Sequence, residues 1–124
     1  MTIMDAIGRL DVLKANAYSP EQKIRWLSTL DGRIKREVLD AHEGDAGAGF
    51  TGYDEHTHMD TVLLVPEPYD DIYILWMQAQ IDYFNGEYRK YNNAMAMFET
   101  AFQNFQDDYR KNHMPRGRLN RFLF

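Results

Sequence analysis

The strongest constraint on the fold is an apolar pattern in the second half of the chain. From residue 74 to residue 109, apolar side chains recur at alternating steps of three and four, as in a heptad-type helical repeat. They are Ile74, Met77, Ile81, Phe84, Tyr88, Tyr91, Met95, Phe98, Phe102, Phe105 and Tyr109. Asn85-Gly86 and Asn92-Asn93 interrupt this pattern with residues that favour turns and caps. We therefore predict a break or marked kink, with helices at about 70–85 and 88–112.

Two further helices are predicted in the first half. An apolar stripe formed by Ile3, Ile7, Leu10 and Leu13 predicts a helix at about 3–15. Ser19 and Pro20 suit the N-cap and the first position of a second helix, at about 19–42, in which Gly32 is a weak point. Asp31 and Lys35 have the spacing of a helical ion pair. The fold class is all-α, a small bundle of about four helices.

A long non-helical segment separates the two halves. Residues 43–60 contain four glycines and few apolar residues, which predicts a loop. Residues 61–69, which we call the arm, begin with a β-prone run, and Pro66 and Pro68 forbid a normal helix there. The arm either pairs with another copy of the chain or packs in extended form on its own helices. We favour the second arrangement.

Composition narrows the class of protein. The net charge of −5 and the pI near 5.3 argue against a general nucleic-acid binder, which would show a basic face. The chain has no cysteine, no segment resembling a signal peptide and no apolar run of 18 residues. We expect a soluble cytoplasmic protein with one helical domain, residues 1–114, and a basic, apolar tail, residues 115–124.

Residues with catalytic or metal-binding chemistry are scarce. His56 and His58 lie among Asp54, Glu55 and Asp60, an arrangement that could hold a divalent ion if a separate segment supplied another ligand. Polar residues in a glycine-rich loop are more often only solvated. The chain contains no phosphate-binding loop and no nucleophile motif. We predict no catalytic residue, no metal and no cofactor, and rank a metal-dependent enzyme last.

Aromatic residues are abundant in the heptad-type pattern. Helical spacing predicts that Ile81, Phe84, Phe98, Phe102 and Phe105 belong to the core. A small core does not need as many tyrosines as the chain supplies at positions 73, 83, 88, 91 and 109. We expect a share of them at subunit contacts, where aromatic residues are enriched.

Three blocks of the sequence carry a resemblance to a known family. They read YSPEQKIRWLSTLDGRI, LLVPEPYDDIYILWMQAQIDYFNGEYRKYNNAMAMF and YRKNHMPRG, and the similarity covers about residues 16–117. In this order they resemble the small head–tail connector (adaptor) proteins of long-tailed phages and prophages. The resemblance implies an all-helical subunit of a homo-oligomeric ring, about twelve subunits round, beneath the portal protein. Such a ring extends the DNA channel and meets the next tail-proximal neck protein.

The resemblance also implies a location and contact residues. The protein would lie in the virion neck, after assembly in the host cytoplasm, with no membrane contact, and DNA would pass without sequence-specific binding. Candidate contacts with neighbouring subunits in the arm and the following helix are Leu63, Leu64, Val65, Pro66, Pro68, Tyr69 and Tyr73. The tail would dock on the portal through Arg116, Arg118, Arg121, Phe122, Leu123 and Phe124. The alternative is a small dimeric interaction module of regulatory or antitoxin type.

Overall fold

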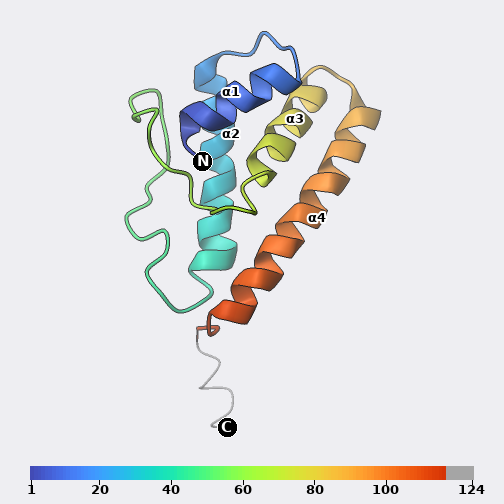
Figure 1. The fold of residues 1–124 in the computed structure, drawn as a ribbon. Coiled ribbons are helices and arrows are strands. Elements are labelled where there is room, and N and C mark those ends of the chain that lie inside the picture. The colour runs from blue at the N-terminus through green and yellow to red at the C-terminus, as the bar shows by residue number, and fades with distance from the viewer. Residues whose placement is uncertain (117–124) are drawn as a thin grey trace.

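The computed structural model describes residues 1–116 and confirms an all-α fold. The α-helices within these residues are α1 (Ile3–Leu13), α2 (Pro20–Ile34), α3 (Ile72–Phe84) and α4 (Tyr88–Asn112) (Figure 1). A five-residue π-helix, Lys35–Leu39, continues α2. Residues 40–71 are not helical and cross back along one side of the bundle to reach α3. The long loop and the extended arm predicted from the sequence lie in this stretch.

Side-chain caps start the first two helices. At α1, the Thr2 hydroxyl accepts the Asp5 N–H and the Asp5 carboxylate accepts the Thr2 N–H, which forms a complete capping box. At α2, the Ser19 hydroxyl accepts the N–H of Gln22, and Pro20 is the first helical residue, as predicted. Gly32 remains inside α2. The predicted helix at 19–42 was too long, because the backbone turns into the π-helix after Ile34 and leaves helical geometry after Leu39.

The predicted break between α3 and α4 is confirmed at residues 85–87. Gly86 has a φ angle of +76°, in the left-handed region that glycine enters at little cost. The Asn85 N–H donates to the Ile81 carbonyl and the Glu87 N–H to the Asp82 carbonyl, which satisfies the end of α3. The short connection lets α4 turn back and pack antiparallel against α3 (Figure 1).

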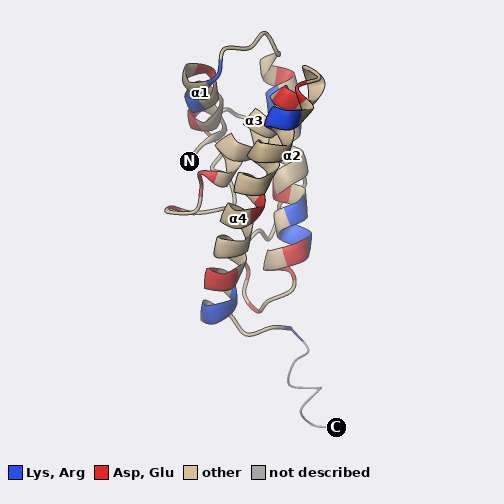
Figure 2. Cartoon of the chain, turned by 90° about the vertical axis from the view of Figure 1, so that its right-hand side faces the viewer, with Lys and Arg blue, Asp and Glu red and all other residues tan. Residues whose placement is uncertain are grey.

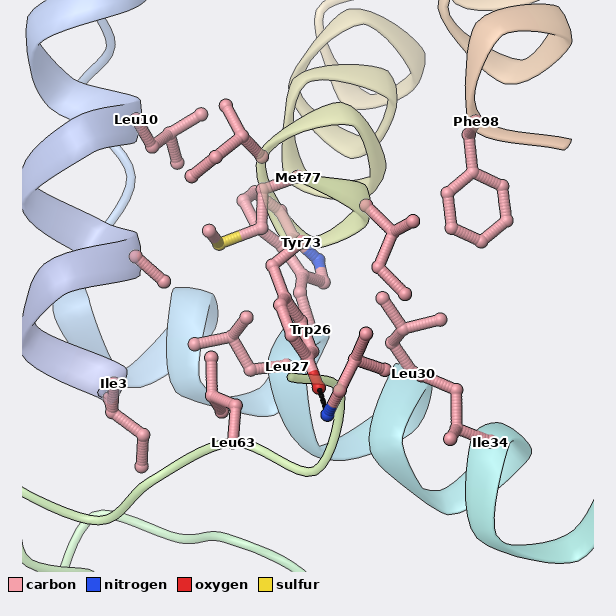
Figure 3. Packing of buried hydrophobic residues seen from close by; sticks show 14 of the residues in the cluster. Ile3, Leu10, Trp26, Leu27, Leu30, Ile34, Leu63, Tyr73, Met77 and Phe98 are labelled. Atoms are coloured by element: carbon pink, nitrogen blue, oxygen red, sulfur yellow. Dashed lines mark hydrogen bonds between the residues drawn. The ribbon is translucent and has the colours of Figure 1, made fainter. Parts of the chain in front are cut away.

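Helix α3 is the centre of the core. It packs against α1, α2 and α4, and apolar side chains cover most of its circumference. Met77 and Tyr73 of α3 meet Leu10 of α1 and Leu27 of α2 in Figure 3, while Phe98 approaches from α4. The buried residues of α4 are Phe98, Phe102 and Phe105, so these predicted core positions and Ile81 are confirmed.

Phe84 was predicted to be a core residue, and this prediction is wrong. Phe84 is 56% exposed because it is the last residue of α3 and α2 covers only one face of its ring. One face of its ring still stacks on Trp26, with 6.0 Å between ring centroids and an interplanar angle of 15°. The other side of the ring faces outward.

Two glycines should respond to alanine substitution with opposite signs. Gly86→Ala should lower the free energy of unfolding by about 1 kcal/mol, because a Cβ is strained at positive φ. Gly32→Ala should raise it by roughly 0.5–1 kcal/mol, because alanine favours the helix and its Cβ would meet no atom within 4 Å. Urea unfolding followed by circular dichroism measures both changes. A stabilised Gly86→Ala variant would contradict the left-handed turn.

Candidate interaction surfaces

The arm packs on the chain's own helices. Its backbone pairs with residues 1–3: the Leu63 N–H donates to the Met1 carbonyl at 2.9 Å and the Ile3 N–H donates to the Thr61 carbonyl at 3.0 Å. Leu63 points into the core (Figure 3), and both Leu63 and Val65 are buried. The arm therefore has the extended, packed arrangement that we favoured over pairing with another copy.

This packing corrects part of the predicted contact set. Leu63, Val65 and Tyr73 were expected to touch a neighbouring subunit, but all three side chains are buried in the chain's own core. Leu63 and Val65 are buried, whereas Leu64 is half-buried at the edge of the core and Pro66 is exposed, as expected where side chains alternate in direction along extended backbone. Tyr73 lies in the first turn of α3 on its buried side.

A single buried carboxylate, that of Asp31 in α2, holds the arm in place. Its Oδ1 accepts the Tyr73 hydroxyl at 2.6 Å, and its Oδ2 accepts the Tyr53 hydroxyl at 2.5 Å and the Leu64 N–H at 3.1 Å. The Tyr73 hydroxyl in turn accepts the Val65 N–H at 2.8 Å (Figure 3). These bonds connect α2, the loop, the arm and α3. The predicted pairing of Asp31 with Lys35 is wrong, because Lys35 pairs with Asp40 at 2.9 Å instead.

Burial sets the ionisation of this cluster. Burial raises the pKa of Asp31, although the two tyrosine hydroxyls and the Leu64 N–H act in the opposite direction by stabilising the carboxylate. Burial also raises the pKa of Tyr53 and Tyr73, and the nearby charge of Asp31 adds to both shifts. Both hydroxyls therefore stay protonated as donors near neutral pH. The cluster has a structural role, since each of its bonds is made within the fold.

The outer side of the arm lines a hollow. Pro66 and Pro68 are exposed, and Leu64 and Tyr69 are half-buried. They face the end of α4 at Phe105 across a space of about 450 Å³. Of the predicted contact residues in the arm, the structure thus brings these four together at one surface.

Arg116 fastens the end of the described chain to the start of the long loop. Its N–H donates to the Ala41 carbonyl and its guanidinium Nη2 to the Gly44 carbonyl, both at 3.0 Å. The Glu43 N–H donates to the Met114 carbonyl at 2.7 Å. The predicted tail contacts Arg118, Arg121, Phe122, Leu123 and Phe124 lie outside the described residues.

An apolar groove that the sequence analysis did not predict lies over α3, between α1 and α4. Its volume is about 720 Å³. Its apolar lining consists mainly of Val12 and Leu13 of α1, Ile74 and Leu75 of α3, and Met97 of α4. Val12 is 87% exposed and Met97 is 60% exposed. The sequence did contain a sign of this groove. Val12 and Met97 are apolar, yet they lie outside the apolar stripes from which the helices were predicted, so a helix that buries its stripe leaves them on the surface.

A second apolar surface lies where α3 meets α4. We call Tyr83, Phe84 and Tyr88 the aromatic corner, since all three are exposed and Tyr83 packs against both other rings. Of the tyrosines considered for subunit contacts, Tyr83 and Tyr88 are thus exposed, while Tyr91 and Tyr109 are half-buried. Within the corner, the Phe84 ring stacks on Trp26 of α2.

The histidine loop shows only local pairing. The distance from His56 Nε2 to Glu55 Oε1 is 3.5 Å, and the distance from His58 Nδ1 to Asp60 Oδ2 is also 3.5 Å. All four side chains are exposed. Residues 1–116 contain no group of three or more His, Asp or Glu side chains placed to hold a metal ion. Within the same residues, no helix combines the length and the apolar character needed to cross a bilayer.

Comparisons of the chain with protein-family models, with curated proteins and with solved structures found no significant match.

Removing one hydroxyl should show how strongly the Asp31 cluster stabilises the fold. Tyr73→Phe removes a donor to Asp31 and the acceptor of the Val65 N–H, so it should lower the free energy of unfolding by about 1–3 kcal/mol. Tyr83→Phe, which removes an exposed hydroxyl, is the matched control and should change it by less than about 0.5 kcal/mol. Urea unfolding measures both. Equal effects would rule out a special role for the cluster.

The raised pKa of Asp31 predicts an unusual pH dependence. Between the ordinary value of 3.8 and the raised pKa, the folded chain holds this proton and the unfolded chain does not. The contribution of Asp31 to the free energy of unfolding should therefore fall as pH rises through that interval, and stay constant above it. Unfolding of the native chain and of Asp31→Asn across a pH series isolates this contribution. A carboxyl NMR titration of Asp31 with a midpoint at or below 3.8 would refute the shift.

Proposed function

We propose that the chain is a structural, non-enzymatic subunit of a phage or prophage neck. It assembles as a homo-oligomeric ring under the portal protein, links the capsid to the tail and extends the DNA channel. The structural observation that carries the proposal is the presence of two separate exposed apolar surfaces on one small domain, the groove and the aromatic corner. Clustered exposed apolar side chains are typical of sites of protein contact.

Two different surfaces favour a ring over a simple dimer. A two-fold dimer needs one self-complementary patch, whereas a ring needs two distinct patches that meet head to tail. The groove is a hollow lined by aliphatic residues, whereas the aromatic corner consists of exposed rings at the end of α3 and the start of α4, so the two surfaces differ in chemistry. The portal and the next neck protein are proposed as partners because the sequence resembles head–tail connector proteins.

The charge distribution supports a channel component. The chain is acidic overall, and the coloured ribbon in Figure 2 shows basic positions interleaved with acidic ones in this view rather than gathered into a continuous stripe. Proteins that grip DNA neutralise many phosphates with Lys and Arg. A wall with this charge pattern lets DNA pass without sequence-specific binding.

Assembly can be measured by light scattering after size exclusion, over a concentration series, with and without purified portal protein. We expect a ring-sized species, either for the chain alone or only on the portal. Tyr88→Ser should reduce the fraction in the ring, because it removes a 62% exposed ring from the aromatic corner. Val62→Ser, which changes a 67% exposed side chain in the arm, is the control.

The rival function makes a different prediction for the same experiment. A regulatory or antitoxin-type module would give one dimer at every concentration, indifferent to the portal. That outcome would overturn the connector proposal.

A further inference from the structure

We propose that the groove between α1, α3 and α4 receives residues 117–124 of a second copy of the chain. This inference rests on the proposed ring. It assigns residues 117–124 to a neighbouring subunit instead of to the portal, and it names one contact between subunits in addition to the aromatic corner. The groove supplies the acceptor surface, and the C-terminal segment, which lies outside the described residues, supplies the ligand.

The shape and chemistry of the groove suit a short apolar segment. Helix α3 forms its floor with Ile74 and Leu75, and Val12 and Met97 stand on opposite walls. The two wall residues leave most of their apolar surface in water. Grooves between helices with an apolar floor commonly bind peptides through a few spaced apolar anchors.

The C-terminal segment has the composition of such a ligand. Residues 117–124 read GRLNRFLF, in which Leu119, Phe122, Leu123 and Phe124 are apolar and no residue is acidic. Two of the eight residues are arginines, whereas the chain as a whole carries a net charge of −5. The charged residues that line the groove are Arg9 and Asp71, so a basic segment finds one carboxylate there. Its apolar side chains supply most of the contact.

The reach of the segment favours a second copy over the chain's own groove. Arg116 is fastened beside Gly44, past the end of α4. Met97 lies fifteen residues before the last residue of α4, or about 22 Å along the helix. Eight fully extended residues span at most about 26–29 Å, so only the last residues of a taut segment would arrive at Met97 of the same chain. A neighbouring groove placed head to tail needs no such tension, and repeating this contact closes a ring.

A peptide-binding experiment tests the acceptor surface directly. The probe is a fluorescein-labelled synthetic peptide of residues 115–124. The protein is the full chain carrying Phe122→Ser, Leu123→Ser and Phe124→Ser, so that its own segment does not compete. Fluorescence anisotropy should show saturable binding. Adding Val12→Gln and Met97→Gln should weaken it at least about tenfold, since both apolar walls are lost.

The control is Val62→Gln, which replaces an apolar side chain of similar exposure in the arm and should leave peptide affinity unchanged. Circular dichroism and urea unfolding confirm that each variant is folded. No binding, or binding that Val12→Gln with Met97→Gln does not weaken, would overturn the proposal.

A mixing experiment separates contact between copies from contact within one chain. The groove variant, Val12→Gln with Met97→Gln, keeps an intact segment, and the segment variant keeps an intact groove. Each alone should fail to assemble, while an equimolar mixture, above the dissociation constant of the peptide, should give a one-to-one heterodimer by light scattering. A mixture that remains monomeric would overturn docking between copies. Peptide binding by a chain that stays a fixed dimer at every concentration, with or without the portal, would leave the docking intact and refute the connector function.

Discussion

The fold of this chain depends on one buried charge. A carboxylate without partners inside a protein costs several kcal/mol, and Asp31 offsets part of this cost by accepting hydrogen bonds from Tyr53, Tyr73 and the Leu64 N–H. These donors come from the loop, the first turn of α3 and the arm. The hydrogen bonds to Asp31 thus fix the path of the non-helical residues 40–71. In return, these residues supply donors that stabilise the buried carboxylate of α2.

Fixing the arm determines which surfaces remain for partners. Once Leu63 and Val65 enter the core, the prolines and Tyr69 form the outer side of the arm, facing the end of α4. Helix α3 is enclosed by α1, α2 and α4 except along the groove and at its last turn. The two exposed apolar surfaces are therefore the parts of the surroundings of α3 that a single copy of the chain leaves uncovered. Our proposal of assembly with other copies rests on this.

The sequence predicted only part of the candidate surfaces. Alternation along the arm indicates that Leu63 and Leu64 face opposite sides, but it does not tell which side meets the chain's own helices. The groove unites Val12 with Met97, which are far apart in the sequence and carry no shared motif. Phe84 continues a regular apolar pattern and is nevertheless exposed, because the pattern does not show where the neighbouring helices end.

By itself the sequence determined the all-α class, the approximate positions of the four helices, the glycine-rich loop and a break or kink near residues 85–93, which the structure places at Gly86. These features follow from spacing, capping and turn preferences that act over a few residues. Only the tertiary structure decided that Asp31 is a buried acceptor rather than half of a surface ion pair, and that the arm belongs to its own core. Burial and hydrogen bonding in these cases join residues that are 20 or more positions apart, so no local pattern contains them.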